Sequence, residues 1–362
     1  MTTGVWVTAG TLTLPYGTLR TLHEGVSEVR VKQNLHTNLK QVGKRVSLLG
    51  REDTLAFNEI SFLREIDHSN IARVFDVAEV AGSDPALKEV EIIMPYYEGG
   101  SLYDVLARGE RFSSAQARDI SSKALRGLAH LHDHHRILHR DMKPGNLFLA
   151  DDESLVKIGD FGEAMRMDPS GHSDPLLSPQ FWTAPETFSG SRHAVTAEVF
   201  SMGMTLREIL SGPLPYDEYS REDLAKRLSE GKVAVRPRDL DFAVHTPGSL
   251  RRIAQRATHK DPAHRFRSAE EMLDALLGAR FVDWDWPVDG PDGEWTCHGR
   301  FYGEQLRVTT RPIRSKGWRA RAEQLCRSGW RRIRGVQEVT ASTASEAAST
   351  VFSQIDKHLV RV

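Results

Sequence analysis

The stretch His139-Arg-Asp-Met-Lys-Pro-Gly-Asn146 is the most informative part of this 362-residue sequence. Fourteen residues after Asn146 comes a second short motif, Asp160-Phe-Gly162, and Ala184-Pro-Glu186 follows further along the chain. A single three-letter motif often arises by chance, whereas three motifs in a fixed order form a specific pattern. The alternative, that these residues only cap turns in loops, would need all three motifs to coincide.

The three motifs resemble those of the eukaryotic-type (Hanks-type) serine/threonine protein kinase family, and the resemblance extends from about Leu12 to Arg280. It implies an α+β, two-lobe protein kinase fold, with a small β-rich N-lobe and a larger helical C-lobe. It also implies that the γ-phosphate of ATP is transferred to Ser or Thr of protein substrates, with ATP and Mg²⁺ as cofactors.

The resemblance assigns a role to each polar residue of these motifs. Asp141 would accept the proton of the substrate hydroxyl, and Lys143 would steady the γ-phosphate. Asn146 and Asp160 would hold the Mg²⁺ ions, because both offer the hard oxygen ligands that Mg²⁺ prefers. Arg265 matches the family's buried partner for the last residue of Ala184-Pro-Glu186.

The remaining nucleotide contacts are expected in the first hundred residues. Lys44 would grip the α- and β-phosphates, and Glu59, fifteen residues later on a predicted helix, would pair with it. Lys40 is the competing candidate for this lysine, and we expect it to face the other side of its strand. Gly25 is the one glycine retained from the loop that covers the phosphates in the family.

The segment Met94-Pro-Tyr-Tyr97 resembles the family's hinge, which binds adenine. Met94 would be the gatekeeper, and Pro95 would offer its carbonyl to the adenine amino group. Proline can do this because it keeps its backbone acceptor although it lacks an N–H. Tyr97 would supply the backbone donor. An ordinary interlobe loop would look the same in its side chains, since adenine contacts use the backbone.

Several positions depart from the family pattern. His23 and Glu28 stand where glycines are expected, and side chains there obstruct the approach of backbone amides to phosphate. We therefore expect modest affinity for the nucleotide, and a pseudokinase acting as a scaffold or interaction module is the alternative function. Pro179 replaces a threonine that usually contacts the catalytic loop, and Glu198 replaces an aspartate that usually supports it.

Hydrophobic periodicity divides the chain into a strand-rich and a helical part. Apolar patterns predict strands at 26–31, 39–48 and 91–94, and helical spacing predicts a helix at 54–66. Helical spacing then predicts three further helices. The first begins near Ser113 or Ser114, and the second covers 197–210. The third begins with a capping box of Ser268 and Glu271 and ends with Gly278 at C′.

Composition shifts suggest three segments. Residues 1–280 would form the kinase domain, with its N-lobe at about 1–94 and its C-lobe at about 98–280. Residues 281–293 are rich in Pro, Gly and Asp and are predicted to be a linker. Residues 294–362 would form a small α+β accessory domain that is basic and contains tryptophans, with strands followed by a helix at about 345–359.

The accessory domain contains a basic stretch, 300–334, with eleven Lys or Arg and only two Glu. Trp318 and Trp330 are interleaved with these charges, a composition that could bind nucleic acid or an acidic partner. The simpler interpretation, which we favour, is a solvated sheet face whose tryptophans form a core or pack on the kinase. Likewise, five histidines over 130–139 could bind metal, but ordinary surface histidines near a helix end are favoured.

The remaining composition excludes several classes of protein. The formal net charge is −1, and two cysteines cannot form a disulfide framework. The sequence shows no secretory signal and no apolar run long enough to span a bilayer. We therefore expect a cytoplasmic protein without a membrane partner. Ser170, Ser173 and Ser178 lie between Asp160 and Glu186, and we expect activation when at least one of them is phosphorylated.

Overall fold

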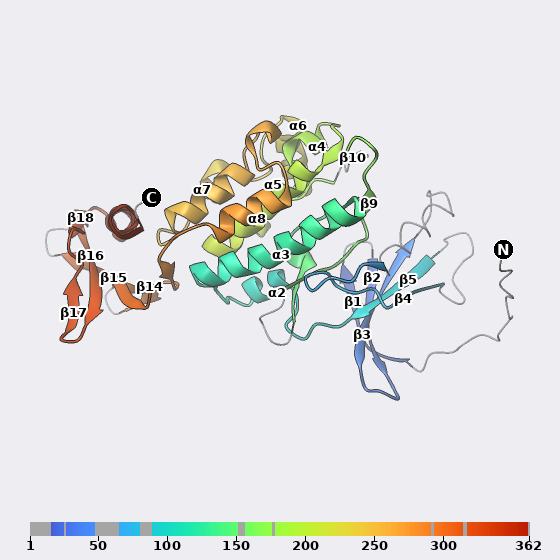
Figure 1. Ribbon diagram of the computed structural model, residues 1–362, viewed down its shortest axis with the longest axis horizontal. Coiled ribbons are helices and arrows are strands. Elements are labelled where there is room, and N and C mark those ends of the chain that lie inside the picture. Colours follow the sequence, from blue (N-terminus) through green and yellow to red (C-terminus); the bar gives the residue numbers. More distant parts are fainter. Residues whose placement is uncertain are drawn as a thin grey trace, which may run out of the picture. The chain divides into compact units, whose positions relative to one another are not determined.

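The computed structural model describes residues 16–24, 27–47, 65–79, 89–150, 156–175, 178–290, 293–313 and 317–360 (Figure 1). The chain divides into two compact units, Met1–Glu98 and Gly99–Val362. Among the helices that the structure describes, none combines the length and the low charge needed to cross a bilayer.

The first unit contains a five-stranded antiparallel sheet with the order β1-β2-β3-β5-β4. Two of its strands confirm those predicted at 26–31 and 39–48, and a third contains the one predicted at 91–94. The helix predicted at 54–66 lies outside the described residues except at its end, where Ile66 is buried. The strands are β1 (Tyr16–Glu24), β2 (Ser27–Asn34), β3 (Lys40–Ser47), β4 (Asp76–Glu79) and β5 (Glu89–Pro95).

The sheet corrects one expectation about its two lysines. Lys40 and Lys44 are four residues apart in β3, so the two-residue period of a strand puts both on the same face, not on opposite faces. They differ in burial. Lys44 is 9% exposed, between Val29 of β2 and Ile92 of β5, whereas the side chain of Lys40 is 41% exposed and bonds Glu98 at 2.5 Å.

The second unit begins with a helical lobe in which α3 packs against α5 and α8 (Figure 1). Ser113 caps α3 through a capping box with Gln116, and the helix ends at Arg136, which is left-handed with φ 54°. The predicted apolar stripes of α3 and α5 are buried. The helices are α2 (Leu102–Ala107), α3 (Ser114–His135), α4 (Pro185–Phe188), α5 (Val195–Ser211), α6 (Arg221–Ser229), α7 (Gly248–Ala257) and α8 (Ala269–Leu277).

The last of these helices confirms one capping prediction and corrects another. The Ser268 side chain accepts a hydrogen bond from the Glu271 amide at 3.0 Å, as predicted for the N-cap of α8. Gly278 is the C-cap itself and has φ −78°. It therefore does not occupy the left-handed C′ position that the sequence suggested.

Short strands and 3₁₀ turns connect the helices of this lobe. The paired strands are β6 (Ile137–Leu138) with β9 (Met165–Arg166), β7 (Leu147–Leu149) with β8 (Val156–Ile158), and β10 (His172–Ser173) with β11 (His193–Ala194). The 3₁₀ turns are Pro144–Asn146, Tyr216–Glu218, Pro237–Leu240 and Pro262–His264.

The chain ends in an antiparallel sheet with the order β12-β14-β15-β16-β17, to which β13 and β18 are joined. Helix α9 packs on β15, β16 and β18, as the predicted α+β composition requires (Figure 1). The elements are β12 (Asp283–Trp284), β13 (Val288–Asp289), β14 (Trp295–Phe301), β15 (Glu304–Ile313), β16 (Gly317–Cys326), β17 (Gly329–Arg332), β18 (Val339–Ala341), α9 (Ala344–Ile355) and a π-helical turn (Asp356–Val360).

The segment predicted as a linker is part of this sheet. It contains β12 and β13, and Trp284 of β12 is 1% exposed, with its ring 5.0 Å from that of Phe352. The Trp284 ring lies 2.3 Å from where a Cβ of Gly299 would be, so only glycine fits there. The core beneath the terminal sheet therefore uses Trp284. Trp318 and Trp330, which were expected to form a core or pack on the kinase, are only half-buried.

Side chains of this C-terminal region also cap helices of the helical lobe. The Asp283 carboxylate accepts a hydrogen bond from the Ala115 amide in the first turn of α3 at 2.8 Å. Asp356 does the same for Gly248, the first residue of α7, at 2.8 Å. Free amides at a helix start favour such carboxylates. The C-terminal region therefore supplies hydrogen-bond acceptors to the free amides at the start of α3 and α7.

Candidate active site

The motif at 139–146 forms the loop between β6 and β7. His139 is fully buried, and its Nε2 donates to the carbonyl of Gly159 at 2.9 Å. The next residue, Arg140, has φ 68°, a left-handed conformation that non-glycine residues seldom adopt. Its amide donates to the carboxylate of Glu198. The loop is thus held from both sides in an unusual conformation just before Asp141.

The carboxylate of Asp141 is the centre of the loop's polar contacts. Lys143 Nζ lies 2.7 Å from its Oδ2, and Asn146 Nδ2 lies 2.9 Å from the same oxygen. Asn146 Nδ2 also donates to the Asp141 carbonyl at 2.6 Å. These donors fix the position of the carboxylate, and a carboxylate held in place is a group that can accept a proton.

Asn146 and Asp160 are brought together by the hairpin of β7 and β8. Asn146 immediately precedes β7, Leu147 pairs with Ile158, and the Gly159 amide bonds the Asn146 carbonyl at 3.0 Å. Asp160 follows directly, with φ 59° and its Oδ1 3.3 Å from the Gly162 amide.

This donor pair fits Mg²⁺. Because the Asn146 amide nitrogen bonds Asp141, its amide oxygen is left to act as a hard ligand, and Asp160 supplies a carboxylate at the other end of the same hairpin. Mg²⁺ held there would supply positive charge for the phosphate oxygens.

The sequence did not identify Gln180 as part of this site. Its Oε1 lies 3.4 Å from Lys143 Nζ, so the activation segment reaches the catalytic loop through this amide. The neighbouring Pro179 stands where the family has threonine and has no hydroxyl to make such a contact. The loss of a side-chain donor at 179 was the signal that could have directed attention to the next residue.

Glu198 supports the loop, as expected, but through a cluster that the sequence did not reveal. The carboxylate is 1% exposed, and it lies 2.5 Å from His132 Nε2 and 3.6 Å from His193 Nε2. Burial alone would raise the pKa of Glu198, but hydrogen bonding and charge from the two histidines hold this pKa well below its usual range. A buried anion therefore fixes the Arg140 amide.

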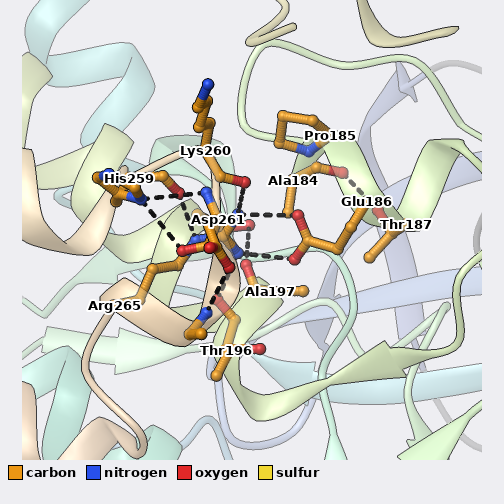
Figure 2. Close-up of polar contacts among 12 residues, drawn as sticks. Ala184, Pro185, Glu186, Thr187, Thr196, Ala197, His259, Lys260, Asp261 and Arg265 are labelled. Carbon is orange, nitrogen blue, oxygen red and sulfur yellow. Dashed lines mark hydrogen bonds and ion pairs between the residues drawn. The ribbon is translucent and has the colours of Figure 1, made fainter. Parts of the chain in front are cut away.

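The predicted ion pair of the large lobe is present (Figure 2). Arg265 Nη1 and Nη2 bond the two carboxylate oxygens of Glu186 at 2.7 and 2.8 Å. The guanidinium also donates to the carbonyls of Thr196, His259 and Lys260, so its donors are satisfied although Arg265 is only 1% exposed. This bidentate pair anchors α4 to the segment before α8.

A pocket opens beside Asp141 between the catalytic loop and the segment before α4. A peptide hydroxyl placed in it would lie next to the carboxylate. Its lining residues are Arg140, Asp141, Met142, Gln180, Trp182, Thr183, Ala184, Thr187, His193 and Ser201.

One wall of this pocket rests on a buried carboxylate. Glu208 Oε1 accepts a hydrogen bond from Trp182 Nε1 at 2.5 Å, and Tyr216 donates to the other oxygen. Burial raises the pKa of Glu208 to about 7, although these hydrogen bonds lower it. The position of Trp182 is therefore linked to a group that titrates near neutral pH.

The predicted nucleotide contacts of the first unit lie on one sheet. Lys44, Met94 and Pro95 are on β3 and β5, which are paired, and Val42 stands opposite Met94. Tyr97 follows β5, and burial raises the pKa of its hydroxyl to about 12. Gly25 and Glu59 lie outside the described residues.

The histidine tract at the end of α3 shows one close pair. His130 Nε2 and His135 Nε2 are 3.3 Å apart, and the His134 ring lies 4.8 Å from that of His130. Within the described part of the chain, no group of three or more His, Cys, Asp or Glu is arranged to hold a metal ion.

Comparison with known proteins identifies the class. The sequence model of the protein kinase domain matches residues 22–276, which is most of the chain. The chain therefore belongs to the protein kinase family.

Its relatives include kinases of a eukaryote and of bacteria. The serine/threonine-protein kinase atg1 of Dictyostelium discoideum is 34% identical over 179 residues, 49% of this chain and 26% of that protein. Serine/threonine-protein kinase PrkC of Bacillus subtilis is 29% identical over 209 residues, which are 57% of this chain and 31% of that protein. A probable serine/threonine-protein kinase of Clostridium perfringens is 28% identical over 220 residues, which are 60% of this chain and 30% of that protein. The chain thus spans about a quarter to a third of the length of these relatives.

Proposed function

We propose that this chain is an ATP-dependent serine/threonine protein kinase. The observation that carries the proposal is the carboxylate of Asp141, which is held by Lys143 and Asn146 and lines a pocket. A general base needs a fixed carboxylate that an incoming hydroxyl can reach. The pseudokinase alternative has less support, because the proton acceptor and the proposed metal ligands are all present.

In the proposed reaction, the substrate hydroxyl oxygen bonds to the γ-phosphorus while its proton passes to a carboxylate oxygen of Asp141. The bond from the γ-phosphorus to the β,γ-bridging oxygen breaks, which leaves ADP. Lys143 balances the charge on the transferring group, and Lys44 binds the other phosphates. Asn146 and Asp160 would hold Mg²⁺, which supplies positive charge when bound.

We infer that Glu28 weakens nucleotide binding. It stands where the family has a glycine, and its carboxylate would bring negative charge close to the expected phosphates. We expect Glu28→Gly to lower the KM for ATP several-fold. An unchanged KM would show that Glu28 does not face the nucleotide.

We infer that Ser170 is the best phosphorylation site of the activation segment. It is exposed, whereas Ser173 is buried in the pair of β10 and β11, and Ser178 is half-buried. Asp168 accepts a hydrogen bond from Ser170 Oγ at 2.7 Å and forms an ion pair with Arg192. Mass spectrometry after incubation with ATP should find phosphate on Ser170, and phosphate only on Ser173 would contradict this choice.

We infer that the kinase works in the cytoplasm on protein substrates and without a membrane partner. Both cysteines, Cys297 and Cys326, are free thiols, which fits a reducing compartment. Fractionation of cells that produce the tagged protein would test the location, and recovery in the membrane fraction would contradict it.

The activity is tested with radiolabelled ATP and a generic protein substrate. We expect Asp141→Asn to lower kcat by about 10³-fold, because the proton acceptor is lost. Asp119→Asn is a matched control, since Asp119 is an exposed carboxylate on α3 that pairs with Lys123. No labelling by the wild-type chain, or equal rates for the wild type and Asp141→Asn, would overturn the proposal.

A further inference from the structure

The outer face of the C-terminal sheet is rich in arginine. Strand alternation turns this face away from the core residues Cys297, Val308 and Ala322, which stand opposite one another on β14, β15 and β16. We call it the arginine face. Its arginines are Arg300 on β14, Arg307 and Arg311 on β15, Arg319 and Arg321 on β16, and Arg332 on β17.

The arginine face keeps positive charge although its arginines have carboxylate neighbours. Glu323 is shared by Arg307, at 2.8 Å, and Arg321. Glu338 is likewise shared by Arg319 and Arg332, at 3.1 and 3.2 Å. One carboxylate can neutralise only one of two guanidinium groups, so each shared carboxylate leaves a net positive charge. Arg311 is paired with Glu294, and Arg300 lies beside both Asp283 and Asp285. The six arginines therefore outnumber their five carboxylate neighbours by one.

Two of these guanidinium groups are held in place before any ligand arrives. Glu323 is buried at the centre of the face, with its side chain 4% exposed, and it fixes Arg307 and Arg321. Arg307 also lies 4.3 Å from the centre of the Trp330 ring. Guanidinium groups that are already ordered lose less entropy when they bind phosphate.

The outer arginines remain available to a ligand. The six side chains are between 27% and 69% exposed. Exposed ion pairs such as those of Arg319 and Arg332 contribute little free energy, so phosphate can replace their carboxylate partner. Arg327, Arg331 and Arg334 are exposed around β17 and add further positive charge at this edge.

The shape of the face favours a duplex over a single strand. Single-strand binders need open aromatic rings on which bases stack, but Trp330 is half-buried with Arg307 over its ring, and Trp318 lies on the opposite face of the sheet. The sheet runs β12-β14-β15-β16-β17 and is too broad to enter a groove, so it would lie across the phosphates of a duplex. β15 and β16 are each ten residues long.

We propose that the arginine face binds double-stranded DNA through its phosphates, so that the kinase lobe is carried to DNA by its terminal domain. The binding requires no base-specific contact, because arginine contacts to phosphate give affinity without sequence information. It is also separate from phosphoryl transfer, since none of these arginines belongs to the site around Asp141.

The test uses the full chain and a fluorescein-labelled duplex of about 20 base pairs, with anisotropy as the readout. If about four phosphates are contacted, the affinity should fall about a hundredfold between about 50 and 200 mM salt. Arg319→Ala/Arg332→Ala should weaken binding at low salt by about tenfold or more and reduce the salt slope by about two. Arg319→Lys/Arg332→Lys should keep most of the affinity.

The matched control is Arg108→Ala/Arg267→Ala, which removes two exposed, glutamate-paired arginines from the kinase lobe. It should bind DNA like the wild type, and both pairs of variants should keep full kinase activity, which shows that they are folded. Three results would overturn the proposal. They are no duplex binding at low salt, an equal loss in the control, and tighter binding of single-stranded DNA or duplex RNA.

Discussion

The catalytic loop and the arginine face are built in contrasting ways. Residues 139–146 place their chemistry within one short stretch, and a single hairpin adds Asp160. The arginine face draws its side chains from four strands over 300–332, and a buried glutamate at 323 organises them. Chemistry that is local in the sequence can be recognised as a motif, whereas chemistry that depends on strand register cannot.

The largest predicted effect is on stability, and it tests whether the terminal sheet begins within residues 281–293. We expect Trp284→Ala to destabilise the chain by about 4 kcal/mol, because it empties a core position of the terminal sheet. Thermal or urea unfolding measures this loss. Trp318→Ala is the matched control and should cost far less, since Trp318 is half-buried. Equal losses would mean that residues 281–293 behave as a linker after all.

The next effect concerns the wall of the pocket in the kinase lobe. The pKa of Glu208 is about 7 in the folded chain, above the ordinary glutamate value of 4.5, so the folded state binds its proton more tightly. Below pH 4.5 the bound proton adds about 3 kcal/mol to the free energy of unfolding, and this stabilisation is lost as the pH rises to about 7. In melting curves recorded between pH 5 and about 8, Glu208→Gln should remove this decrease of stability with rising pH.

A slope that is the same in wild type and Glu208→Gln would show that the carboxylate is hydrated and not buried with Trp182. Glu222→Gln is a suitable control, because Glu222 lies in the exposed first turn of α6 and should leave the pH dependence as it is.

The third prediction compares two lysines of one strand. Lys44→Met should lower kcat/KM by about a hundredfold, because phosphate loses a buried positive charge. Lys40→Met removes an exposed lysine from the same strand and face, and it should change kcat/KM less than about twofold. If Lys40→Met is the more damaging change, the assignment of the phosphate lysine is reversed.

The smallest effect tests the contact that the motifs did not show. Gln180→Ala should lower kcat by about fivefold with little change in stability, because Lys143 loses a partner worth about 1 kcal/mol. Gln180→Glu keeps an acceptor and should retain more activity than Gln180→Ala. Steady-state kinetics and melting curves distinguish these outcomes, and an effect on KM alone would place Gln180 in substrate binding.

Much of the fold followed from patterns in the sequence. Capping residues and apolar stripes predicted α3, α5 and α8, because helices satisfy short-range rules. The motifs also predicted the pair of Glu186 with Arg265 and the support of the catalytic loop by Glu198. The histidines around Glu198 were missed, because a histidine's spacing in sequence does not show which buried acid it meets.

By itself, the sequence determined the kinase family and the order of a strand-rich part before a helical part, since these depend on residue types at short spacings. It also proposed Asp141, Lys143, Asn146 and Asp160 as site residues. Only the tertiary structure decided that Trp284 belongs to the terminal core, that Gln180 meets Lys143, and that six arginines share one face. The physical reason is that strand register and side-chain burial depend on partners far away in the chain. Local sequence patterns carry no record of those partners.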